Sequence, residues 1–231
     1  MSIPDLLCPN ISIVVCARNE EQNIEPVLTK CKAITDEIIV IEGNSTDQTF
    51  DVASKHTKFI FRDSGAGKGA AIREGIKQAT REIIVFVDAD GSHDPADIPN
   101  LVEPIQADLA DHVTGSRMQG GSDELAGDFN QFLRRTGSDI ITLMINRRFQ
   151  VRLTDSQNGF RAIKTKVARN LGLSELITTI EQEMIIKTLR KGYRMAEVST
   201  HEYRRMSGVS CIRIRKVAFR YVFSAIKYLY F

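Results

Sequence analysis

The stretch that decides the fold is residues 83–91, Ile-Ile-Val-Phe-Val-Asp-Ala-Asp-Gly. Five apolar residues lead directly into two aspartates, Asp88 and Asp90, that one alanine separates. A short apolar run of this kind is typical of a strand buried on both faces of a parallel sheet. Open α/β sheets bind ligands at the carboxyl ends of their strands, and two carboxylates there can hold Mg²⁺ or Mn²⁺ beside a diphosphate. The same aspartates can equally begin a turn, with Asp94 capping the next segment.

Strand and helix patterns alternate along the first 115 residues. Apolar, partly β-branched runs predict strands at residues 11–17, 37–41, 58–61 and 83–87. Helices are expected from Arg18 to about Cys31, after a cap at Ser45 or Thr46, and over residues 70–79. This order predicts an α/β fold with a mostly parallel central sheet and helices on both faces. The polar loops at residues 17–20, 42–47 and 88–90 then surround one crevice.

Length and composition are those of an ordinary globular protein. The chain has 231 residues, 42% hydrophobic content and a net charge of +2, enough for one domain with a short extension. Its four cysteines are scattered without a Cys-x-x-Cys pair, which indicates reduced thiols in a cytoplasmic protein and no zinc site. No signal segment and no run of 18 apolar residues is visible. We expect residues 1–210 to form the main domain and residues 211–231 a separate basic helix.

Two common nucleotide-binding motifs are missing. A dinucleotide-binding fold needs Gly-x-Gly-x-x-Gly after the first strand, where this chain has Ala-Arg-Asn-Glu-Glu-Gln at residues 17–22. A P-loop needs Gly-x-x-x-x-Gly-Lys followed by Ser or Thr, but Gly67 and Lys68 are followed by Gly69, and Arg62 stands at the first glycine position. The crevice must therefore hold its ligand by other means.

Seven segments in register resemble glycosyltransferases of family 2, which have the GT-A fold. Four of them lie in the first half of the chain: residues 17–20, 42–49, 68–71 and 88–91. Gly-Ser-Arg at 115–117, Asp-Ser-Gln-Asn-Gly-Phe-Arg at 155–161 and Lys-Gly-Tyr-Arg-Met-Ala-Glu-Val at 191–198 extend the match. The later segments are similar to the polyprenyl-phosphate branch, the dolichol-phosphate mannosyl- and glucosyltransferases. The resemblance covers residues 10–210.

The resemblance implies an inverting, metal-dependent transfer of a hexose. The donor would be a nucleotide-diphosphate sugar of the GDP-mannose or UDP-glucose class, and the acceptor a polyprenyl or dolichyl phosphate. Asp88 and Asp90 would bind Mg²⁺ or Mn²⁺, which neutralises the leaving diphosphate. The implied donor-binding residues are Ala17, Arg18, Asn19, Glu20, Glu42, Lys68, Asp88, Ala89 and Arg135. Glu42 replaces the aspartate usual in the family, and Ser92 replaces a glutamine that often follows the metal pair, so the third metal ligand is open.

Arginines and acids complete the implied site. A guanidinium grips phosphate bidentately, and Arg117, Arg135 and Arg205 match phosphate-binding positions of relatives. Arg205 falls in a loop that closes on the diphosphate in relatives; here the loop ends Ser-Cys instead of Ser-Lys. Asp155 and Glu183 are candidates to orient the acceptor or the sugar. The implied catalytic set is therefore Asp90, Asp155, Glu183, Arg117 and Arg205. The histidines are interpreted as structural, with His93, three residues past Asp90, as the one exception to watch.

The C-terminal segment bears on the acceptor. From Tyr203 to Phe231 there are seven Arg or Lys residues and no acid, interleaved with aromatic residues. Such a helix is typical of one lying on an anionic membrane, although core-docking and dimer helices also use aromatic residues. The segment 132–149, with paired arginines around an apolar centre, favours the same surface. We therefore expect a peripheral protein on the cytoplasmic membrane face.

Two other functions stay open at this stage. A family 2 enzyme can act on a soluble or glycolipid hydroxyl, in which case Asp155 or Glu183 would be a general base. A lipid phosphate needs no such base, because its second pKa is near 6. The chain can also be a non-catalytic nucleotide-sugar-binding protein. No nucleic-acid-binding motif is present, and the sequence leaves the base, the sugar and the oligomeric state undetermined.

Overall fold

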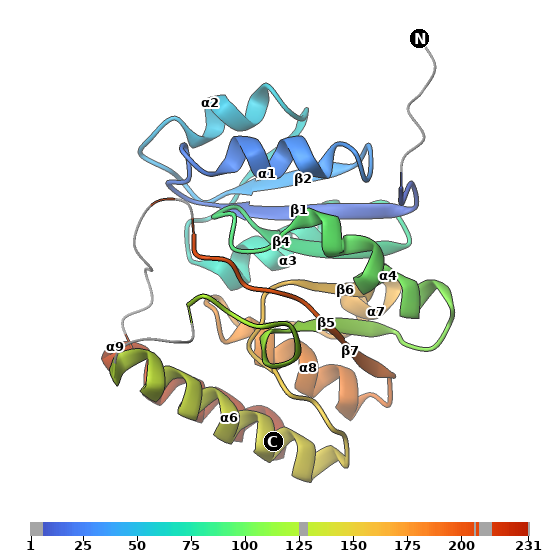
Figure 1. Ribbon diagram of the computed structural model, residues 1–231, viewed down its shortest axis with the longest axis vertical. Helices are drawn as coiled ribbons and strands as arrows, with labels where there is room; N and C mark the ends of the chain where they lie inside the picture. The colour runs from blue at the N-terminus through green and yellow to red at the C-terminus, as the bar shows by residue number, and fades with distance from the viewer. Residues whose placement is uncertain (1–6, 125–128, 206, 208–213, 231) are drawn as a thin grey trace.

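A seven-stranded sheet runs through the computed structural model, which describes residues 7–124, 129–205, 207 and 214–230 (Figure 1). The strands are β1 (Ile11–Ala17), β2 (Ile38–Glu42), β3 (Phe59–Arg62), β4 (Ile83–Asp88), β5 (His112–Ser116), β6 (Arg161–Lys164) and β7 (Met195–Ser199). Their order in space is β3-β2-β1-β4-β6-β5-β7. Only β6 runs antiparallel to its neighbours in this sheet. The predicted fold class, a mostly parallel sheet, is confirmed.

Helices cover both faces of this sheet. They are α1 (Ile24–Cys31), α2 (Thr49–Ser54), α3 (Lys68–Gln78), the 3₁₀ helix η1 (Pro95–Asp97), α4 (Ile98–Gln106), α5 (Arg117–Gly120), α6 (Phe129–Phe149), α7 (Thr165–Asn170), α8 (Ile180–Arg190) and α9 (Ile214–Tyr230). Alternate residues of one strand point to opposite faces. In β1, Ile13 and Val15 join the core under α1 and α4, whereas Val14 joins the core under α3, α7 and α8. Because both sides are buried, the central strands are apolar throughout.

A third cluster lies away from the sheet, where α6 and α9 pack side by side against α8 (Figure 1). It is formed by Ile141 and Ile145 of α6, Ile185 of α8, and Tyr228 and Leu229 of α9. Within the described residues, none of the helices has the length and apolar character needed to cross a bilayer. The two helices thus form a separate layer beside the carboxyl-terminal half of the sheet.

Two predicted helix starts are wrong, for a common reason. The first helix begins at Ile24 and not at Arg18, and the second begins at Thr49 without a cap from Ser45 or Thr46. Hydrogen bonds between the two loops form instead: the Ser45 hydroxyl accepts the backbone N–H of Asn19 at 3.0 Å. The Thr49 N–H is bonded by Asp47, at 3.0 Å. Tertiary contacts between the loops therefore outweigh local helix signals.

Gly75 on α3 gives a test of how closely this helix packs on β1. A Cβ at Gly75 would lie 2.4 Å from Cγ1 of Val14, a contact too short to exist without movement. In an open helix Gly→Ala is stabilising, but here we expect Gly75→Ala to cost roughly 1–3 kcal/mol through overpacking. Urea denaturation measures the loss, and the double variant Gly75→Ala, Val14→Ala should recover part of it. An increase in stability in the single variant would contradict the packing.

Candidate active site

The loops after β1 and β2 are joined by hydrogen bonds at the edge of the crevice. Ala17 accepts the Gly43 N–H at 2.9 Å, and Asn19 accepts the Thr46 N–H at 2.9 Å. Asn19 has a φ of +56°, a left-handed conformation that asparagine tolerates better than most residues. Hydrogen bonds between the two loops therefore fix the conformation of the predicted donor-binding residues at 17–20. Among these residues, Arg18 is exposed.

Glu42 ends β2 beside these loops. Its side chain is buried, and one oxygen accepts the Ser45 N–H at 2.5 Å. The other oxygen lies 3.7 Å from Nε of Arg62, which is itself largely exposed. The longer arm of a glutamate is thus used to hold its own loop, and a ligand hydroxyl would compete with Ser45 for this carboxylate.

Asp88 at the end of β4 is joined by a lysine to a second acid. Lys68 Nζ lies 2.8 Å from the Asp88 carboxylate and 2.8 Å from Oε1 of Glu181. Burial by itself would lower the pKa of Lys68, but the two carboxylates raise it above its ordinary value. Burial likewise opposes ionisation of Asp88, yet Lys68 holds the pKa of this carboxyl below its usual range. Lys68 and Asp88 are therefore both charged at neutral pH.

Gly159 provides the space for this cluster. A Cβ there would lie 2.5 Å from Lys68 Nζ and 2.9 Å from an Asp88 oxygen. Any side chain at this position would displace the ammonium group. The glycine of the segment 155–161 is therefore required by the charge cluster, and this is a reason for the motif that the sequence alone does not give.

Asp90 faces a different cation. One oxygen of Asp90 lies 2.8 Å from Nη2 of Arg205, and the other accepts the Ser92 N–H at 3.0 Å. Glu20 lies nearby, since burial and the charge of Asp90 raise the pKa of its carboxyl. Beyond Arg205, the Ser207 carbonyl accepts a hydrogen bond from the Asn23 side chain at 3.1 Å. The segment after β7 thus crosses the crevice from Asp90 to α1.

No complete metal-ligand set is preformed among the described residues. They contain no convergent group of three or more His, Cys, Asp or Glu side chains. The Ser92 hydroxyl lies 3.4 Å from Nδ1 of His93, and both residues are buried. The His93 ring stacks on Phe160, and burial lowers the pKa of the ring. Any metal here would take its protein ligands from Asp88 and Asp90.

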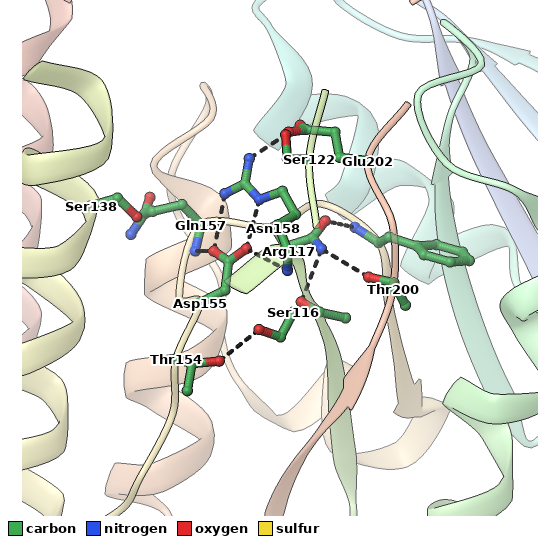
Figure 2. A network of polar contacts seen from close by, with 12 residues as sticks. Ser116, Arg117, Ser122, Ser138, Thr154, Asp155, Gln157, Asn158, Thr200 and Glu202 are labelled. Atoms are coloured by element: carbon green, nitrogen blue, oxygen red, sulfur yellow. Dashed lines mark hydrogen bonds and ion pairs between the residues drawn. The ribbon is translucent and has the colours of Figure 1, made fainter. Parts of the chain in front are cut away.

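Arg117 lies in a buried ion-pair network (Figure 2). Its Nε and Nη2 donate to the two oxygens of Asp155 at 2.6 and 3.0 Å, and its Nη1 donates to Glu202 at 3.1 Å. Only 7% of Arg117 is exposed. Burial is overcome by Asp155 and Glu202, which raise the pKa of the guanidinium. The network ties together the segments that follow β5, precede β6 and follow β7, so a phosphate would reach Arg117 only by displacing a carboxylate.

Glu183 and Arg135 lie apart from the two aspartates. The buried Glu183 carboxylate accepts the N–H groups of Ser174 and Glu175, both at 2.9 Å, and contacts Lys187 at 2.6 Å. It therefore fixes the loop before α8. Arg135 is exposed on α6. Their predicted roles toward acceptor and phosphate stay predictions.

Glu181 is the site residue that sequence reasoning missed. It lies two positions before Glu183 on α8, and residues two apart on an α-helix point about 200° from each other. One acid thus faces Lys68 and the other faces the loop of Ser174. The helical period, applied with Lys68 in mind, is the signal that separates them.

With this geometry described, the chain can be compared with known proteins. The fold is that of solved GT-A glycosyltransferases. A solved structure of glucosyl-3-phosphoglycerate synthase from Mycobacterium tuberculosis, in complex with Mn²⁺, UDP and glucosyl-3-phosphoglycerate, matches with a TM-score of 0.76 at 21% identity, over 96% of this chain and 80% of that one. The family model described as glycosyl transferase family 2 matches residues 12–172, and the chain belongs to that family.

Two relatives show how far the similarity extends. An uncharacterized glycosyltransferase of Mycobacterium tuberculosis is 28% identical over 200 residues, which cover 87% of this chain and 88% of the relative. The dolichol-phosphate mannosyltransferase of Pyrococcus furiosus is 28% identical over 189 residues, which cover 77% of this chain and 52% of that protein. The prediction of a family 2 enzyme is confirmed.

We expect glutamine substitutions at Glu181 and Glu183 to have different effects, the first on activity and the second on stability. Glu181→Gln removes one of the two carboxylate charges that face Lys68. We expect sugar transfer to slow at least about tenfold, which is about 1.4 kcal/mol in the barrier, with the fold intact. Glu183→Gln weakens buried hydrogen bonds and should cost about 1–3 kcal/mol of stability. Turnover and thermal unfolding of both variants separate the roles. The reverse pattern would assign the active-site position to Glu183.

Proposed function

We propose that this chain transfers a hexose from a nucleotide-diphosphate sugar to a polyprenyl phosphate at a membrane surface. Family membership and the crevice support the donor class, since solved neighbours with the same fold hold UDP or UDP-glucose. The acceptor rests on one observation above all: an exposed apolar face on α9 and α6 beside the catalytic sheet. The dolichol-phosphate mannosyltransferase among the relatives supports the same acceptor class.

We further propose that Mg²⁺ or Mn²⁺ serves as cofactor, as Mn²⁺ and Mg²⁺ are held in solved neighbours. Mg²⁺ is commonly bound by one or two carboxylates together with substrate phosphates, so an incomplete protein ligand set fits it. Asp90 and Asp88 would hold the ion, with Arg205 released from Asp90 toward the diphosphate. The ion would supply positive charge to the leaving group.

Two of the candidate acids fit an acceptor that needs no general base. Both oxygens of Asp155 are bonded by Arg117, which, against the effect of burial, lowers the pKa of this carboxyl. Hydrogen bonds from Lys187 and from backbone N–H groups do the same for Glu183. A carboxyl with a lowered pKa is a weak base, whereas a lipid phosphate is largely dianionic at pH 7 without help.

The exposed face of α9 is apolar and aromatic. Its exposed fractions run from 41% to 79%, and its members are Phe219, Val222, Phe223, Ile226 and Tyr230. On α6, Ile140 and Leu143 are exposed at 54% and 67%. Arginines and a lysine are also exposed on these two helices: Arg135, Arg147, Arg148, Arg220 and Lys227. Aromatic residues among cations are the pattern of a surface that binds anionic lipid.

One observation keeps a second acceptor class in view. Glu181 lies in the crevice with Lys68 as its ion-pair partner. If the acceptor is a hydroxyl compound, Glu181 replaces Asp155 and Glu183 as the group placed to receive its proton. The acceptor dependence of the reaction distinguishes the two cases.

The test is a nucleotide-release assay with Mn²⁺ and GDP-mannose, UDP-glucose or UDP-N-acetylglucosamine, each with and without a short polyprenyl phosphate. We expect release that needs both one donor and the lipid phosphate. Asp90→Ala should lower it roughly 100-fold or more, about 2.7 kcal/mol, while Asp51→Ala on the exposed side of α2 leaves it unchanged. Release only with hydroxyl acceptors would favour the second class, and binding of a donor without any transfer would indicate a non-catalytic protein.

Two exposed leucines provide a matched test of the membrane surface. Leu143 lies on the proposed lipid-binding face, and Leu109, exposed at 71%, lies after α4. We expect Leu143→Glu to weaken binding to anionic vesicles about tenfold or more, since a buried leucine contributes about 1.5–3 kcal/mol, and Leu109→Glu to have no effect. Cosedimentation with vesicles measures this. Equal binding of the two variants would contradict the assignment of this face.

A further inference from the structure

His201 has two hydrogen-bond partners that can only accept. Its Nδ1 lies 3.0 Å from the carbonyl oxygen of Gly120, and its Nε2 lies 3.0 Å from Oδ1 of Asp123. A carbonyl and a carboxylate have no proton to give, so both bonds form together only when both ring nitrogens carry one. The Gly120 carbonyl and the Asp123 carboxylate raise the pKa of His201 above its ordinary value. The geometry therefore selects the imidazolium.

These bonds lie within a strip that joins residues 117–124 to residues 200–205. The Glu202 N–H donates to Gly121 at 3.0 Å, and the Asp123 N–H donates to Glu202 at 2.8 Å. The second oxygen of Asp123 accepts the Arg204 N–H at 3.3 Å. One carboxylate therefore holds His201 on one side and the backbone just before Arg205 on the other.

Arg205 is the point at which this strip reaches the crevice. Its N–H donates to Glu124 at 3.4 Å, and its Nη2 lies 2.8 Å from Asp90. Arg205 is therefore directed at Asp90 by a backbone that the strip fixes on one side. The groups that hold this backbone thus lie outside the crevice.

We propose that protonated His201 is a positioning residue for Arg205. The inference rests on the proposed function, in which Arg205 meets the donor diphosphate. The imidazolium draws Asp123 and Gly120 onto the segment after β7, and Asp123 in turn holds the backbone before Arg205. Loss of the proton removes one of the two bonds, and Arg205 becomes less ordered before the donor binds. The donor is then bound more weakly.

The charged groups around the ring all bear on its titration. Asp123 faces it directly, and Asp97 of η1 interacts with it over a longer distance. Glu202 also favours the charged ring, although Arg117 holds that carboxylate. The Arg204 side chain is exposed, so solvent screens its charge. Because the pKa of His201 is raised by folding, the contact is complete below the ordinary histidine pKa and is lost as pH rises through the raised value.

Two readouts test this, one of them without any activity. In NMR spectra of the wild-type protein, the His201 ring should titrate above the ordinary histidine range, and the backbone amides of residues 120–124 and 203–205 should shift with the same midpoint. Asp123→Asn should move that midpoint to lower pH. A His201 ring that is neutral at pH 6, or amides that do not follow it, would overturn the proposal even if the enzyme proved inactive.

The second readout is the pH dependence of the donor KM. In the wild type KM should rise several-fold as pH passes the His201 midpoint, with a smaller change in kcat. His201→Gln should show a raised KM at low pH and no further rise, whereas His56→Gln, beside α2, should follow the wild type. An unchanged pH profile in His201→Gln would refute the positioning role. Absence of transfer with every donor would instead refute the proposed function and leave the NMR result to decide on the contact.

Discussion

Lys68 holds two carboxylates, Asp88 and Glu181, that would repel each other without it. Two unit charges near each other in a protein interior interact by several kcal/mol, and removing one partner of a buried pair leaves a costly charge. The same arrangement recurs where Arg117 lies between Asp155 and Glu202. The acidic crevice can exist because each of these buried carboxylates has a cation beside it.

This charge pairing determines how a diphosphate can enter. Asp90 shares its cation with Glu124, since Arg205 Nη2 lies 2.8 Å from Asp90 and its Nε 3.9 Å from Glu124. Arg205 is carried by a segment outside the sheet, and 25% of its side chain is exposed. Under the proposed function, Asp90 would hold the divalent ion there and the Arg205 guanidinium would bind the phosphate. Lys68 and Arg117 are held more closely, because both acid partners of each lie within 3.1 Å, whereas the second partner of Arg205 is 3.9 Å away.

The sheet was predictable from sequence because burial on both faces leaves a plain signal. Residues 11–17 were expected as a strand and form β1 with the same bounds. The carboxyl-end loops followed from topology, which brought residues 17–20, 42–47 and 88–90 to one edge. The partners of each acid did not follow. Glu181 and Glu183 are the same type of residue on the same helix, and only the direction of their side chains on α8 distinguishes them. Arg117 matches a phosphate-binding position of relatives, and the sequence did not reveal its carboxylate partners, which are 38 and 85 residues away.

The helix starts failed for a related reason. Asn19 and Ser45 carry good local capping and turn signals, but their bonds join two loops that are 26 residues apart. A local pattern cannot report a partner at that distance. Where sequence reasoning succeeded, the stabilising contacts repeat with the period of the element; where it failed, a single long-range bond decides the local structure.

The exposed face of α9 and the catalytic crevice are joined through one loop. Tyr228 of α9 donates to Glu175 at 2.9 Å and bonds the Ser174 hydroxyl at 2.7 Å, while Glu183 accepts the backbone N–H groups of both residues. The next residue, Leu176, accepts the Gly69 N–H at 2.9 Å at the start of α3, the helix that begins with Lys68. The inner side of α9 therefore helps to hold the loop that contacts the start of α3. Its outer side, with large aromatic residues in water, gains free energy only by meeting an apolar phase. A lipid surface that covers this face would lie one loop away from the lysine that holds Asp88, and this places the acceptor phase where the proposed reaction requires it.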